Sequence, residues 1–164
     1  MNRRRLALGA MVCVFLLGNA RAQAPYGAVE VDRFPGAAGI DFPLDHQIAL
    51  VEDIIREAGR AFHGIEIVRE GESAPQGKPT LKIAGSVIKF KPGSRAKRYL
   101  IGFGAGATVI KAHVKLIDAA SGEVRAEGDI QGVTWIGIAG GSSDKAGDRL
   151  AKKVTALAKS KRLL

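Results

Sequence analysis

The feature that most constrains the fold of this chain is one apolar stripe in its first half. Its members fall at alternating spacings of four and three residues and are Leu44, Ile48, Val51, Ile55, Ala58 and Phe62. This period places them along one side of an α-helix, with charged residues such as Glu52 and Arg56 largely off it. A helix with one apolar side needs a second layer to bury that side, so we expect it to pack against a sheet.

Segments of alternating polarity predict that sheet. Strands are expected near residues 26–33, 65–68, 81–90, 108–117 and 123–135, and Gly85 is expected to mark a bulge in the third of them. In the fourth strand, Ile110, Ala112, Val114 and Leu116 are expected to face inward. The turn at residues 118–122 contains a glycine and predicts a hairpin. The acidic residues of the last strand are then expected to pair with the outward lysines of the fourth strand.

A second amphipathic helix ends the chain, and its apolar stripe is Ala146, Leu150, Val154 and Leu157. The predicted order is therefore β-α-β-β-β-β-α. We expect an α+β, two-layer sandwich: a mostly antiparallel sheet of four to five strands with two helices packed on one face. Residues 23–164 form one domain in this interpretation.

Residues 1–22 have the pattern of a cleavable signal peptide. Three arginines at positions 3–5 precede an uncharged, largely apolar run, and Ala20 and Ala22 supply the small residues required before a cleavage site. The run is shorter than the roughly 20 apolar residues of a membrane span. We expect cleavage after Ala22; a cut after Ala24, an uncleaved anchor and twin-arginine export are the alternatives. Cys13 lies within the apolar run, so no lipid anchor is expected.

Removal of this segment takes away four arginines and no acid, and the formal net charge falls from +9 to +5. No cysteine remains, so no disulfide is expected. These properties predict a periplasmic protein of a Gram-negative-type bacterium, without a membrane span. Nucleic acid is not an expected partner there, whereas an envelope protein or an anionic envelope component is. The oligomeric state stays open.

The segment 89–106 is the most unusual in the chain, because it combines basic and aromatic residues with three glycines. Candidate binding residues are Arg95, Lys97, Arg98, Tyr99 and Phe103, with Trp135 as a further anchor. The alternatives are a solvated hairpin tip and, for Trp135, a place at one end of the core. The glycines do not follow the G-x-G-x-x-G spacing and precede a strand, so no nucleotide and no other cofactor is expected.

No pattern of catalytic residues is recognisable. His46 and His63 lie at opposite ends of the predicted helix, roughly 25 Å apart at 1.5 Å per residue, so no metal site is expected. None of the serines lies in a G-x-S-x-G motif. Enzymatic activity is therefore uncertain, and the residues favour a protein without it.

The stretch from Gly93 to Glu127, followed by a glycine-rich loop and a basic final helix, resembles the bacterial domain of unknown function 4410 family. The resemblance implies an α+β domain in the bacterial envelope, and it implies no reaction. Many members carry a lipid anchor, which is not expected here. We predict a non-enzymatic binding or assembly module of the cell envelope. The alternatives are a small envelope-acting hydrolase or transferase, and a homo-oligomer built through sheet edges.

Overall fold

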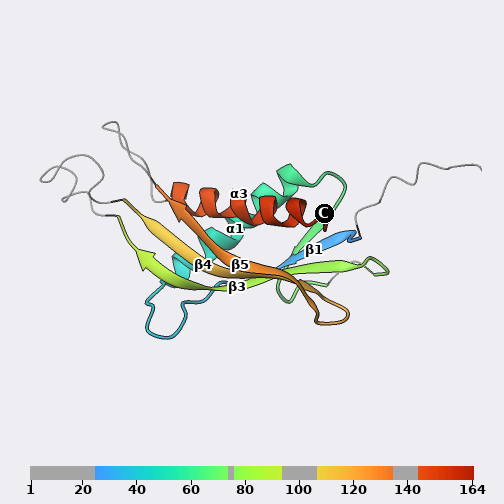
Figure 1. The fold of residues 1–164 in the computed structure, drawn as a ribbon, viewed down its shortest axis with the longest axis horizontal. Helices are drawn as coiled ribbons and strands as arrows, with labels where there is room; N and C mark the ends of the chain where they lie inside the picture. The colour runs from blue at the N-terminus through green and yellow to red at the C-terminus, as the bar shows by residue number, and fades with distance from the viewer. Residues whose placement is uncertain (1–24, 74–75, 94–106, 135–143) are drawn as a thin grey trace, which may run out of the picture.

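A computed structural model describes residues 25–73, 76–93, 107–134 and 144–164 as two helices on one face of a five-stranded sheet (Figure 1). The elements are β1 (Ala28–Val31), α1 (Leu44–Ala61), β2 (Glu66–Arg69), β3 (Thr80–Lys91), β4 (Val109–Asp118), β5 (Val124–Val133) and α3 (Asp144–Ser160). The predicted order and the two-layer α+β architecture are confirmed.

The sheet is mixed, whereas we expected it to be mostly antiparallel. Its strand order is β2-β1-β3-β4-β5, and β1 runs parallel to both of its neighbours. Only the β3-β4-β5 half is antiparallel. The helix α1 connects β1 to β2 across one face, which is the connection that a parallel pair requires. Alternating polarity reveals which side of a strand is buried, but it does not reveal the direction of the neighbouring strand.

The core lies between the helices and one face of the sheet. The helix α3 packs on β4 and β5, and α1 packs on α3, β1 and β2. The expected inward residues of β4 are buried, as are Ala146, Leu150 and Val154 of α3. The largest fully buried side chains are Phe34, Leu50, Ile54, Leu81, Ile83, Leu116, Leu150, Val29, Val31, Val87, Val114 and Val154.

In the described part of the chain, the opposite face of the sheet carries a network of ion pairs and no helix (Figure 1). Lys111 Nζ lies 2.9 Å from Asp129 Oδ2, and His113 Nδ1 lies 2.9 Å from Asp129 Oδ1. The expected pairing between β4 and β5 is therefore confirmed at these residues. Such exposed pairs each contribute little to the stability of the fold, because solvent screens them.

The stripe predicted for α1 is wrong at its start. Leu44 and Ile48 are 62% and 55% exposed, whereas Leu50 and Ile54, outside that stripe, are buried. The strands β1 and β2 have four residues each and β3 has twelve. Figure 1 shows α1 beginning beside the far part of β3, beyond both short strands. The described chain therefore leaves this part of the helix uncovered.

Candidate functional site

The candidate binding residues and the cleavage-site residues predicted from the sequence lie outside the described part of the chain. This holds for the candidate binding residues Arg95, Lys97, Arg98, Tyr99, Phe103 and Trp135, and for Ala20 and Ala22 at the expected cleavage site. Lys89 and Lys91, from the same basic segment, end β3 and are exposed. The binding role of the segment therefore stays a prediction.

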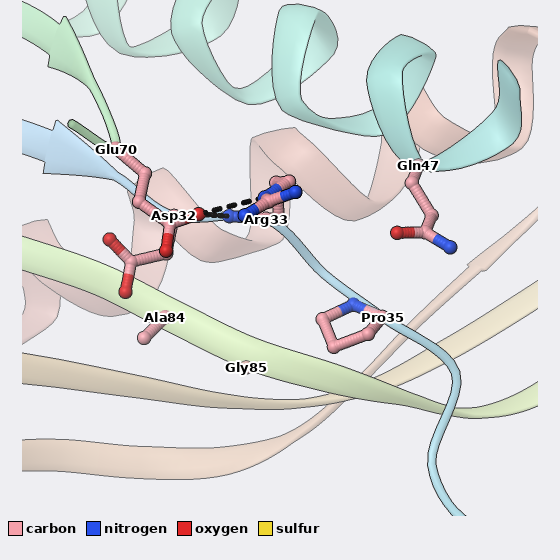
Figure 2. A pocket seen from close by; sticks show the side chains of 7 residues that line it. All are labelled: Asp32, Arg33, Pro35, Gln47, Glu70, Ala84 and Gly85. Atoms are coloured by element: carbon pink, nitrogen blue, oxygen red, sulfur yellow. Dashed lines mark hydrogen bonds and ion pairs between the residues drawn. The ribbon is translucent and has the colours of Figure 1, made fainter. Parts of the chain in front are cut away.

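A different site is visible where β1 and β2 end. A recess of about 400 Å³ lies between these strand ends, the first turn of α1 and the middle of β3 (Figure 2). It is lined by Asp32, Arg33, Pro35, Gln47, Glu70, Ala84 and Gly85. Carboxyl ends of parallel strands are a common place for binding sites in open sheets. The periodicity of the sequence could not indicate this recess, because its position depends on the parallel pairing of β1 and β2.

The recess exists because the chain leaves β3 for a short stretch. The Asp32 amide donates to the Ile83 carbonyl at 2.9 Å, and the Val87 amide donates to the Pro35 carbonyl at 2.8 Å. Between these two bonds, the buried ring of Phe34 packs over Gly85. A Cβ on Gly85 would overlap the His113 carbonyl oxygen and lie 2.6 Å from that ring. The expected bulge is therefore not at Gly85, since the register shifts between Val87 and Lys89.

Asp32 is the least satisfied polar group of the recess. Its Oδ1 is buried and accepts no hydrogen bond, although Lys82 Nζ lies 3.5 Å away. Burial raises the pKa of the Asp32 carboxyl, and Lys82 opposes that shift only in part. The pKa of Lys82 is also raised, because Asp32 and Glu30 outweigh the effect of burial. The raised pKa of Lys82 indicates a strong interaction with Asp32, whereas the raised pKa of Asp32 indicates a weak one. The distances favour Glu30, at 3.3 Å, as the nearer partner of Lys82, and leave Asp32 undercompensated.

A second charged pair closes the other side of the recess. Glu70 Oε2 accepts hydrogen bonds from Arg33 Nε at 3.0 Å and from the Arg33 amide at 3.4 Å (Figure 2). These hydrogen bonds lower the pKa of the Glu70 carboxyl. The pair joins the residues that follow β1 to those that follow β2 at this side of the recess.

The lining supplies charge and hydrogen-bonding groups. Gln47 points from α1 toward the recess, and its Nε2 donates to the Phe42 carbonyl at 2.8 Å. None of the described lining residues is a serine, threonine, cysteine or histidine. Within the described ranges, no three histidine, cysteine, aspartate or glutamate side chains are grouped to hold a metal ion. The arrangement can therefore hold a polar group, and it offers no nucleophile from its described walls.

The apolar start of α1 adjoins the recess. Leu44 and Ile48 are one helical turn apart and flank Gln47 in the sequence. We call these two side chains the α1-start surface. Val124, at the start of β5, is the third large hydrophobic side chain that is exposed in the described part of the chain. The sequence pattern predicts Leu44 and Ile48 as inward residues, and the short neighbouring strands leave them outside.

The fold and the recess define a small two-layer α+β domain in which the described helices cover one face of the sheet. The family model described as Domain of unknown function (DUF4410) matches residues 63–138. This match confirms the predicted resemblance to that family, over a shorter range than the whole domain. No curated protein matches the chain. In the described ranges, neither helix has the length and apolar character needed to cross a bilayer.

Two solved structures share the fold. The PelC dodecamer from Paraburkholderia phytofirmans is 17% identical, with a TM-score of 0.58 over 83% of this chain and 92% of that chain. A variant of the same protein with a leucine replaced by methionine, also a dodecamer, is 18% identical, with a TM-score of 0.56 over 82% and 88%. A minor lipoprotein from Acinetobacter baumannii is 9% identical, with a TM-score of 0.49 over 84% and 95%. That score is too low to establish a shared fold.

Proposed function

We propose that this protein is a non-enzymatic assembly module of the bacterial cell envelope, and that it binds another protein through the α1-start surface. The observation that carries the proposal is the exposure of Leu44 and Ile48, at 62% and 55%. Burial of one such side chain is worth about 1.5–3 kcal/mol. Adjacent exposed apolar side chains rimmed by polar groups are typical of interaction sites.

The surroundings of this surface support a protein partner. The recess beside it has the Arg33–Glu70 pair on one side and Gln47 on the other. Protein interfaces commonly combine an apolar centre with such a polar rim. The protein of shared fold and its point variant are both described as dodecamers, so this architecture is compatible with assembly into larger complexes.

An envelope location is part of the proposal. It is supported by the signal-peptide pattern of residues 1–22 and by the family resemblance. We propose a periplasmic protein without a lipid anchor. The basic residues Arg95, Lys97 and Arg98 are a proposed second contact, for an anionic envelope component. N-terminal sequencing of chain recovered from the periplasm is expected to begin at Gln23; an uncleaved or cytoplasmic chain would contradict this location.

A small hydrolase or transferase is the alternative function. The observation in its favour is Asp32, because a carboxyl with a raised pKa beside a cavity is typical of an acid or base in catalysis. Against it, the described walls of the recess bring no nucleophile to Asp32. We therefore prefer the assembly module.

The test is crosslinking inside the cell at one defined position. A photo-reactive amino acid replaces Ile48 in the full chain, and the matched control carries it in place of the neighbouring Ala49. Both positions are exposed on α1, but they lie on different sides of the helix. We expect position 48 to give a protein adduct and position 49 to give little. The absence of a protein adduct at position 48, or equal adducts at both positions, would contradict the proposed function.

A further inference from the structure

We propose that the protein bound by the α1-start surface is a second copy of this chain, docked head to tail. In this arrangement, Leu44 and Ile48 of one copy contact the β4–β5 hairpin of the next copy around Val124. The inference rests on the proposed function, since it names the partner of the same surface. It also predicts that the contact repeats from copy to copy.

The described chain exposes apolar side chains at two separate places. One is the α1-start surface, and the other is Val124, which is 43% exposed and begins β5. In Figure 1 the start of α1 and the β4–β5 connection lie toward opposite ends of the longest dimension. Two different patches at opposite ends can meet in a head-to-tail arrangement, in which one patch of each copy contacts the other patch of the next copy. They fit a heterologous contact, which closes into a ring or continues as a filament.

The hairpin that carries Val124 is held in one shape. The Asp118 carboxylate accepts hydrogen bonds from the Ala120 and Ser121 amides at 3.0 and 2.9 Å, and from the Tyr26 hydroxyl at 2.9 Å. These bonds lower the pKa of Asp118. Gly122 has a φ of 73°, in the region that favours glycine. A preformed turn loses little conformational entropy on docking, which favours binding.

The helix α3 leaves this half of β5 accessible. Lys153 Nζ donates to the Gln131 carbonyl at 2.7 Å, and Arg149 donates to the Val133 carbonyl. These two side chains therefore occupy backbone acceptors in the second half of the strand. The first half, from Val124 to Asp129, has mostly exposed or half-exposed residues. An exposed part of an edge strand is a natural place for contact with another chain.

A second copy is favoured over an unrelated partner for two reasons. Each copy supplies both apolar patches, so every patch within a ring has a complement. The two solved structures of shared fold, which are one protein and its point variant at TM-scores of 0.58 and 0.56, are dodecamers. Assemblies of that kind need two distinct contact surfaces on each copy when the contact is heterologous.

The experiment measures the mass of the chain from Gln23 by sedimentation velocity. The variants are Leu44→Glu with Ile48→Glu, which charges one patch, and Val124→Glu, which charges the other. Ala49→Glu adds the same charge to another side of α1 and is the matched control. All four positions are exposed, so circular dichroism should show unchanged folding. Leu44→Gln with Ile48→Gln and Val124→Gln repeat the test if a glutamate variant does not fold.

We expect oligomers of more than two copies for the wild type and for Ala49→Glu, and single copies for each patch variant alone; a wild type that stops at two copies would overturn the head-to-tail contact. An equimolar mixture of the two patch variants is the decisive sample. Each then retains the patch that the other has lost, so the mixture should form a one-to-one complex of twice the single-copy mass. A mixture that stays as single copies, or patch variants that keep the wild-type mass, would overturn the head-to-tail contact. A single-copy wild type would also overturn it, while an adduct to a different protein at position 48 would preserve the proposed function.

Discussion

The two helices of this domain cover the sheet to very different degrees. Ala146, Leu150, Val154 and Ala158 of α3 are all fully buried on long antiparallel strands. The start of α1 extends beyond two four-residue strands, and there Leu44 and Ile48 remain exposed beside the recess. Both helices have an amphipathic pattern in the sequence, so the difference comes from the lengths of the strands beneath them. We infer that the α3 half maintains the fold and that the α1 start is available for a partner.

The largest expected difference between the halves comes from two leucines. Leu150→Ala should lower the free energy of unfolding by about 2–5 kcal/mol, because the side chain is fully buried and leaves a cavity. Leu44→Ala should change it by no more than about 0.5 kcal/mol in the dissociated protein, since the side chain is exposed. Urea unfolding at a concentration that yields single copies measures both values. Equal losses would contradict the assignment of the α3 half as the stabilising one.

Two glycines of β5 test how closely α3 approaches the sheet. A Cβ on Gly132 would collide with the Ala146 carbonyl oxygen and lie 2.9 Å from the Leu150 nitrogen, whereas a Cβ on Gly128 would meet nothing within 4 Å. We expect Gly132→Ala to destabilise the fold by about 1–3 kcal/mol. Gly128→Ala should be neutral or slightly stabilising. The same urea series measures them, and a harmless Gly132→Ala would show that α3 does not lie this close to β5.

Replacement of Asp32 should have a smaller effect on the stability of the fold, and this effect should depend on pH. Burial raises the pKa of its carboxyl, so the stability linked to this group is complete below the ordinary carboxyl pKa. That stability is lost as the pH rises through the raised pKa. Asp32→Asn should therefore be more stable than the wild type at neutral pH, by on the order of 1 kcal/mol. The gain should disappear in acid. Thermal unfolding across the acid-to-neutral range measures it, and a less stable variant at neutral pH would show that the pair with Lys82 dominates.

The smallest effect should come from Asp129, on the other half of the sheet and with the opposite sign. Hydrogen bonds from Lys111 and His113 lower the pKa of this carboxyl. Its stabilising effect is present above the ordinary carboxyl pKa and is lost as the pH falls through the lowered value. Asp129→Asn should be slightly less stable than the wild type at neutral pH and equal to it in strong acid. The contrast between the two halves of the sheet would be contradicted if Asp32→Asn and Asp129→Asn shifted the unfolding temperature at neutral pH in the same direction.

The sequence could predict the elements because they depend on local patterns. The alternation in β4 and the stripe of α3 identified inward residues such as Ala112 and Leu150, which are buried. The sequence could not predict that β1 pairs in parallel with β2 and β3, since pairing direction depends on the path of the connections. The recess and the exposure of Leu44 follow from that pairing and from the short strands. The periodicity of the sequence therefore could not predict the recess or the exposure of Leu44.

The most direct test of the central claim is whether a second copy covers Ile48. The Ile48→Cys variant of the chain from Gln23, which has no natural cysteine, is labelled with a thiol reagent over a range of protein concentrations. Ala49→Cys, in the same background, is the control. We predict slow labelling of the Ile48→Cys variant at high concentration, faster labelling on dilution, and fast labelling of the control throughout. Labelling of the Ile48→Cys variant as fast as the control at every concentration would contradict the account.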